Sequence, residues 1–285
     1  MIQLSQITET IQKRFSCRTY QDKPLTREQV DHLKAMMAAQ DKTFLNAQTR
    51  FELIYATPED RRSLASLGTY GTIRDPAGFI VGAVQPSRYD MEAFGYRMEE
   101  IILYATQLGL GTCWLGGFFT KSSFARKIQL EDDEILPAVA SVGWIDENRT
   151  IIDQVMRRQA RAHQRYPWER LFFNQDFTTP LKTVECGRYA VPLEMVRLGP
   201  SASNRQPWRV VKQGREYHFY LQRTPGYPPG ILRLADLQRV DIGIAICHFS
   251  LSAASLGLNG RWVEGDPRLP LPDERTQYIL TWECE

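Results

Sequence analysis

The sequence lacks the features that would assign it to several specialised classes of protein. No apolar run in its 285 residues approaches the roughly 20 residues that a membrane-spanning helix needs. Its 35 basic and 33 acidic side chains leave a net charge of only +2, so the overall charge does not attract nucleic acid or an anionic membrane. We therefore expect neither as a partner, and any anion site must be a local cluster of basic residues.

Cysteine and histidine are too few and too scattered to indicate a metal centre or a catalytic triad. The five cysteines form no CxxC pair, and no histidine stands at a metal-ligand spacing from them. His248 has no carboxylate or cysteine at a metal or triad spacing, so we interpret it as structural. We expect reduced thiols and no metal. Because residues 1–15 lack the continuous apolar segment of a signal peptide, we also expect a cytoplasmic protein.

The most distinctive segment that is present is GPSASNRQPW, residues 199–208. Gly199 and Pro200 break the preceding helix, and Ser201, Ser203 and Asn204 carry hydrogen-bonding groups on short side chains. A capped loop before a strand would explain any one of these polar residues. The whole string is typical of a loop that surrounds a flat molecule with polar edges.

A second segment, RFSCR, follows a helical pattern over residues 4–15. Arg14, Ser16 and Arg18 stand at every second position, so an extended chain would project them to one side. Two guanidiniums beside a hydroxyl suit a phosphate group, although solvated surface arginines are an alternative. Thr26 and Gln29 then form a predicted capping box that opens a helix over residues 27–40.

A third segment, GLGTCWLGGFF, follows an apolar helical pattern over residues 92–108. Four glycines within residues 109–117 would let the backbone pass close to something flat. The alternative is a helix that ends at Gly109 and is followed by a buried strand.

Together these three segments resemble motifs of the nitroreductase family of FMN oxidoreductases. The resemblance implies that Arg14, Ser16 and Arg18 hold the FMN phosphate and that the main chain of residues 114–117 faces the isoalloxazine ring. The RYPWERLF segment resembles a further family segment that adds Arg165 near the phosphate. The full set of implied FMN-contacting residues is Arg14, Phe15, Ser16, Arg18, Tyr70, Thr72, Trp114, Leu115, Gly116, Gly117, Arg165, Pro200, Ser201, Ala202, Ser203 and Asn204.

A weak internal repeat indicates how the chain is organised. A helix followed by Gly109, Leu110 and Trp114 is matched, at a constant offset, by a helix followed by Gly257, Leu258 and Trp262. Nitroreductases are normally two-fold homodimers with each flavin at the interface, so the chain resembles that dimer fused into one polypeptide. We predict an α+β, nitroreductase-like fold of two tandem halves, residues 1–175 and 176–285, each with helices and a mixed, mainly antiparallel sheet. Such a chain would be a monomer that mimics the family dimer.

The two predicted halves have lost complementary parts. The first half keeps the RFSCR and WLGG segments, but only Asn46 and Gln48 remain of its polar loop. The second half keeps the intact 199–208 loop, but Glu264 replaces the glycine that corresponds to Gly116. The resemblance therefore implies one FMN site built from both halves and a second site that has decayed.

The implied function is an FMN-dependent NAD(P)H oxidoreductase that reduces an electron-poor small molecule such as a nitroaromatic or a quinone. FMN would carry the chemistry, and no protein side chain is predicted to be catalytic. Two alternatives remain open at this point, a non-catalytic FMN-binding protein that acts as a sensor or store, and a flavin-free scaffold.

Overall fold

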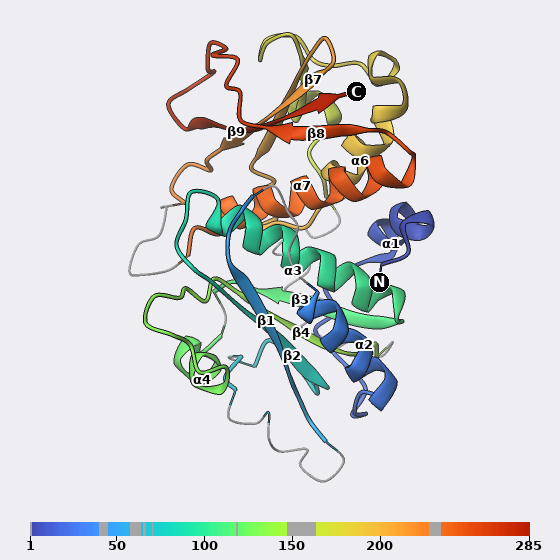
Figure 1. Cartoon of the computed structure of the whole chain (residues 1–285), viewed down its shortest axis with the longest axis vertical. Helices are drawn as coiled ribbons and strands as arrows, with labels where there is room; N and C mark the ends of the chain where they lie inside the picture. The colour runs from blue at the N-terminus through green and yellow to red at the C-terminus, as the bar shows by residue number, and fades with distance from the viewer. Residues whose placement is uncertain are drawn as a thin grey trace.

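The computed structural model describes residues 2–39, 45–57, 64, 67–69, 71–117, 119–146, 164–227 and 235–285. Two long helices, α3 (Asp90–Gln107) and α7 (Leu237–Ser255), cross between two sheets (Figure 1). The elements on the side of α3 are α2 (Arg27–Ala38), β1 (Thr49–Tyr55), β2 (Gly78–Val84), β3 (Leu110–Leu115), α4 (Lys121–Lys127) and β4 (Val139–Trp144), whereas α1 (Ile7–Lys13) contacts both α3 and α7. Those on the side of α7 are β5 (Phe172–Asn174), α6 (Ala190–Leu198), β6 (Trp208–Gln213), β7 (Glu216–Gln222), β8 (Gly260–Val263) and β9 (Thr276–Cys284).

The two sheets repeat one topology. Antiparallel strands run in the order β1-β2-β4-β3 in the first sheet and β6-β7-β9-β8 in the second. The matching elements also follow one another along the chain in the same order in both halves. The order is α2, β1, β2, α3, β3 and β4 in the first half and α6, β6, β7, α7, β8 and β9 in the second. The predicted α+β fold of two tandem halves is confirmed.

The short strand β5 extends the second sheet by pairing in parallel with β6. The sequence does not predict β5, because three residues are too few to show a periodic pattern. The strand forms through its pairing with β6. It lies before residue 175, so the second sheet begins within the range expected for the first half. The boundary at residue 175 stays a prediction.

Two glycines let the central helices cross with their backbones in contact. A Cβ added to Gly95 of α3 would collide with the backbone carbonyl of Val240, and one added to Gly243 of α7 would collide with that of Glu92. Gly95 and Gly243 are 148 residues apart, and so are Glu92 and Val240. The contact is therefore reciprocal, as at the two-fold axis of a symmetric dimer.

Local sequence signals set the ends of these elements. The predicted capping box is present at the start of α2, where Gln29 N donates to Thr26 Oγ1 over 3.2 Å and the Gln29 side chain accepts from Thr26 N over 3.0 Å. Gly109 and Gly257 have φ values of +76° and +63°, which is the left-handed conformation that ends α3 and α7 before strands β3 and β8.

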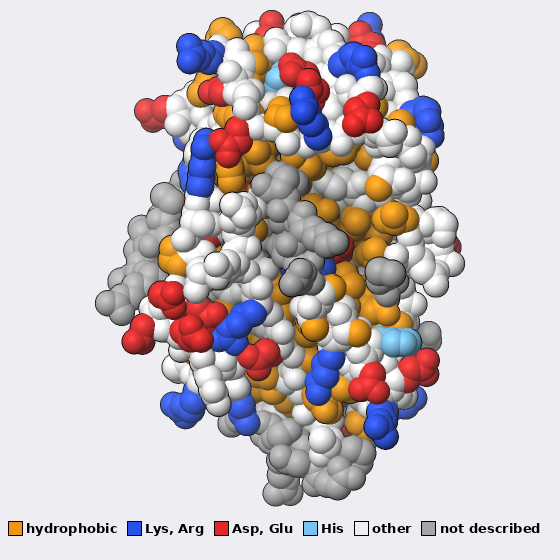
Figure 2. Space-filling view, in the orientation of Figure 1, with side chains coloured by type: hydrophobic (Ala, Val, Ile, Leu, Met, Phe, Trp, Pro, Cys, Tyr) orange, Lys and Arg blue, Asp and Glu red, His pale blue; other side chains and the backbone are white. Residues whose placement is uncertain are grey.

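The interior is continuous across the two halves. Most residues of α3 and α7 are buried, which explains why apolar side chains occupy more than one face of each helix. Hydrophobic side chains also gather along the seam between the halves on the face shown in Figure 2. Among the described residues, no helix is long and apolar enough to cross a membrane.

We predict that Gly243→Ala destabilises the fold by about 2 kcal/mol or more, because the new methyl group would enter the backbone of α3. Helix propensity alone would have the opposite sign, since alanine in a helix interior is favoured over glycine by about 1 kcal/mol. The measurement is urea unfolding at equilibrium. Gly265→Ala is the control, because nothing lies within 4 Å of its added Cβ. Equal stabilities of wild type and Gly243→Ala would contradict the close crossing.

Candidate functional site

The RFSCR segment lies along the edge strand of the first sheet. Arg14 ends α1 in an extended conformation, with φ −61° and ψ 132°. Ser16 then forms a parallel bridge with Thr112 of β3, and Cys17 N donates to Thr112 O over 2.8 Å. The predicted extended conformation is confirmed at these positions, and it places the segment next to the strand that carries the WLGG motif.

Arg14 is buried beside a carboxylate. Its side chain is 5% exposed, and its Nε lies 3.6 Å from Glu99 Oε1 on α3. Arg14 Nη1 is buried and has no hydrogen-bond partner among the described residues. A buried donor without an acceptor is costly, so this atom is suited to an anionic ligand.

Arg165 approaches the same place from the segment that precedes β5. Its Nη2 donates to Leu198 O over 3.0 Å, and its Nη1 lies 3.4 Å from Asn204 Oδ1. Burial, together with the charges of Arg14 and Arg197, lowers the pKa of Arg165 to about 10. The two predicted phosphate ligands Arg14 and Arg165 are thus close enough to repel each other, and an anion between them would relieve this repulsion.

The 199–204 loop is held in shape by its own polar side chains. Ser201 Oγ accepts a hydrogen bond from Gln206 N over 2.8 Å, and Asn204 Nδ2 donates to Gln164 O over 2.9 Å. Ser203 and Asn204 have φ values of 50° and 54°, so the chain turns sharply there. Ser201 therefore caps its own loop, which is the alternative given above for these polar residues. Ser203 is exposed. The implied contacts of Pro200, Ser201, Ala202, Ser203 and Asn204 with FMN stay predictions.

Asp241 of α7 accepts a hydrogen bond from the backbone of this loop. Its Oδ1 accepts a hydrogen bond from Ala202 N over 2.9 Å, and its Oδ2 has no partner among the described residues. Burial raises the pKa of Asp241 well above its usual 3.8. Asp241 was not predicted as a site residue, although an aspartate within an apolar helix is a signal that the sequence contains.

The end of β3 offers main chain rather than side chains. Trp114 Nε1 donates to Glu99 Oε2 over 2.7 Å, and Leu115 is buried in the core. A Cβ on Gly116 would collide with Leu237 at the start of α7, whereas one on Gly117 would meet open space. Leu237 therefore leaves no room for a side chain at Gly116, and the implied contact of the 114–117 main chain with a flavin ring stays a prediction.

The remaining predicted residues are less informative. Thr72 Oγ1 donates to Thr69 O over 2.7 Å, so its hydroxyl stabilises its own turn. Phe15 packs against a core cluster of the first half. Arg18 O accepts from Arg74 N over 2.8 Å. Tyr70 lies outside the described residues.

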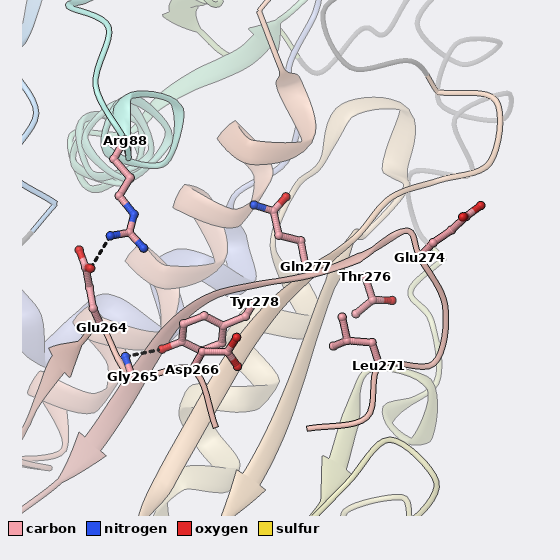
Figure 3. Close-up of a pocket in the computed structure, with 9 residues that line it drawn as sticks. All are labelled: Arg88, Glu264, Gly265, Asp266, Leu271, Glu274, Thr276, Gln277 and Tyr278. Atoms are coloured by element: carbon pink, nitrogen blue, oxygen red, sulfur yellow. Dashed lines mark hydrogen bonds and ion pairs between the residues drawn. The ribbon is translucent and has the colours of Figure 1, made fainter. Parts of the chain in front are cut away.

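The position related to Gly116 by the internal repeat is built differently (Figure 3). Glu264, 148 residues after Gly116, pairs with Arg88 over 2.6 Å, and Gly265 N donates to Tyr278 OH over 3.0 Å. These groups line a pocket of about 710 Å³, together with Asp266, Leu271, Glu274, Thr276 and Gln277. Its three carboxylates outnumber Arg88, so the pocket disfavours a phosphate. No group of three His, Cys, Asp or Glu that could hold a metal occurs in the described part of the chain.

We predict that Asp241→Asn stabilises the protein as the pH rises. In the folded state Asp241 stays protonated above pH 3.8, whereas in the unfolded state it ionises, so ionisation favours unfolding. Asparagine keeps the acceptor for Ala202 N without this cost. The difference in unfolding free energy should vanish below pH 3.8 and grow by up to about 1.4 kcal/mol per pH unit above it.

Urea unfolding of both proteins from pH 3 to pH 8 measures this difference, with Asp266→Asn, at an exposed position, as the control. A difference that does not change with pH would contradict the protonated form.

One solved structure resembles nearly the whole chain, and others match about half of it. A crystal structure described as a "putative nitroreductase" from Thermotoga maritima matches with a TM-score of 0.59 at 18% identity, over 97% of this chain and 93% of that chain. An FMN-dependent nitroreductase from Clostridium difficile matches 50% of this chain and 88% of its own, with 18% identity and a TM-score of 0.40. A nitroreductase with bound FMN from Bacteroides fragilis matches 51% and 91%, with 15% identity and a TM-score of 0.39.

No protein with a curated description matches the chain. A family model described as "Putative TM nitroreductase" matches residues 6–253. Because this match spans most of the sequence, the chain belongs to the nitroreductase family.

Proposed function

We propose that the protein is an FMN-dependent NAD(P)H oxidoreductase that reduces an electron-poor small molecule, such as a nitroaromatic or a quinone, in the cytoplasm. Membership of the nitroreductase family supports a flavin oxidoreductase in general terms. We infer the nicotinamide donor, the class of acceptor and the single flavin site in addition to this.

The observation that carries the proposal is the buried Arg14 Nη1, which has no partner among the described residues. Arg165, whose pKa is lowered by burial and by the charge of Arg14, lies 3.4 Å from Asn204 of the 199–204 loop. Guanidinium groups match the oxygens of a phosphate. The donors present therefore fit the phosphate of FMN. Arg14 and Arg165 belong to residues 1–175, and the 199–204 loop beside Arg165 belongs to residues 176–285.

The residues around this point would bind and orient the cofactor. Gly116 and Gly117 would present main chain to the ring, and Asp241 would keep the 199–204 loop in place through Ala202 N. When bound, FMN would supply the hydride chemistry, taking electrons from NAD(P)H and passing them to the acceptor. The protein would contribute position, positive charge and exclusion of water.

The second position supports a single FMN per chain. At this second position, the Glu264–Arg88 ion pair and the Tyr278 hydroxyl lie where the first position has the main chain of Gly116 and Gly117. The excess of carboxylates there would repel a phosphate. One chain would then form one complete site, as a monomer that mimics the family dimer.

We expect about one FMN per chain after reconstitution and gel filtration, with the flavin absorbance bleaching when NADPH or NADH is added without oxygen. Two FMN per chain would contradict the decay of the second position. Bound FMN that neither nucleotide bleaches would favour a sensor or store. A chain that retains no FMN would leave only the scaffold.

Substitutions test whether the 199–204 loop or the segment around Asn46 binds FMN. Arg14→Ala should weaken FMN binding at least about tenfold, because it removes a charged hydrogen-bond donor. Asn204→Ala should also weaken it, since Asn204 ties the loop to Gln164. The matched control is Asn46→Ala, for which we expect a change within about twofold by fluorescence titration. Equal losses at Asn46 and Asn204 would argue that both sites bind FMN.

A further inference from the structure

A buried acid and a buried histidine join the two halves near Arg14. Glu99 belongs to α3 and His248 to α7, and His248 Nε2 lies 3.0 Å from Glu99 Oε1. Neither side chain is exposed. They are 149 residues apart in the sequence, which is why no spacing motif connects them.

The surroundings fix the number of protons on this pair. His248 Nδ1 lies 2.8 Å from the carbonyl oxygen of Met195, and Nε2 faces the Glu99 carboxyl group. A carbonyl can only accept, so Nδ1 carries a proton, and a second proton must lie between Nε2 and Glu99. Burial raises the pKa of Glu99, but the hydrogen bond from His248 and the charge of Arg14 outweigh it and lower the pKa overall. The geometry therefore places one proton on Nδ1 of His248 and one between its Nε2 and the Glu99 carboxylate.

The pair contacts two segments of the proposed FMN site and the helix that leads into the third. Glu99 accepts a hydrogen bond from the Trp114 indole, next to the 116–117 main chain, and lies 3.6 Å from Arg14. His248 holds Met195 of α6, the helix that leads into the 199–204 loop. Moving Glu99 would therefore disturb Arg14 and Trp114 at once.

The arrangement is not repeated at the other position. The residue that corresponds to Glu99 is Cys247, and Trp262, the counterpart of Trp114, donates its indole N–H to Ser250 Oγ over 2.9 Å. A buried ion pair adds little net stability compared with apolar residues. His248 corresponds to Glu100, which pairs instead with Arg97 of its own helix. The pair that links the two central helices therefore lies beside Arg14, which favours a role in binding.

We propose that Glu99 and His248 are positioning residues that together aim the Arg14 guanidinium at the phosphate of FMN. This inference rests on the proposed function, since it needs a phosphate at Arg14. In this proposal, the contact between the two halves orients Arg14, a side chain of the first half that would bind the ligand.

The test is Glu99→Gln in the full chain, with binding of FMN and of riboflavin, which lacks the phosphate, measured by fluorescence titration. Glutamine is nearly isosteric and can still accept from Trp114. Removing the negative charge of Glu99 would by itself favour an anion near Arg14, so weaker FMN binding would report a change in the orientation of Arg14. We expect FMN affinity to fall about tenfold and riboflavin affinity to change within about twofold.

A second variant and a double variant make the result specific. His248→Gln should show the same selective loss, and His32→Gln, on the exposed face of α2, should show none. Arg14→Gln combined with Glu99→Gln should bind FMN no more weakly than Arg14→Gln alone, because the two residues would act through one contact. Thermal unfolding identifies any variant that does not fold. If His248→Gln does not fold, the result for Glu99→Gln alone decides the test.

Equal losses for FMN and riboflavin, unchanged affinities, or tighter FMN binding by Glu99→Gln would each overturn the positioning role and leave the proposed function intact. A wild-type chain that binds neither flavin would instead overturn the proposed function, and the role of Glu99 and His248 with it.

Discussion

The backbone contact between α3 and α7 is the constraint on which the rest of the structure depends. Because Gly95 and Gly243 remove the side chains at the crossing, each central helix approaches the other as closely as its backbone allows. The start of α7 then reaches the end of β3, where Leu237 meets Gly116, and the start of α3 reaches the end of β8, where Arg88 meets Glu264. A reciprocal crossing thus creates two related positions between the halves.

Fusion into one chain lets these two positions differ. In a homodimer every substitution appears in both sites, whereas here each half changes independently. Gly116 corresponds to Glu264, and Asp241 beneath the intact loop corresponds to the buried, apolar Ala93. Basic side chains gather at one position and carboxylates at the other. Charge and side-chain volume at a few residues therefore decide which position suits an anion.

Most of the fold could be predicted from the sequence, but the contacts between the halves could not. Apolar periodicity predicted α3, and Gly109, whose φ is positive, predicted where α3 ends and β3 begins, because both signals are local in the sequence. Strand β5 has no such signal, since its pairing comes from β6. The site was predicted through family motifs, which named Arg14 and Asn204. Glu99 and His248 were missed because their contact depends on how two helices cross, 149 residues apart.

A site whose donors come from both halves couples ligand binding to the docking of those halves. Arg14 is aligned by α3, while Arg165 and the 199–204 loop are aligned by α6 and α7. A ligand that needs all of them binds only the docked arrangement and stabilises it by mass action, by about 2.7 kcal/mol when its concentration is a hundred times its Kd. The unfavourable terms in the free protein, the unpartnered Arg14 Nη1 and the repulsion between Arg14 and Arg165, are the ones that an anion would remove. Charges that oppose folding without the ligand thereby become the source of its affinity.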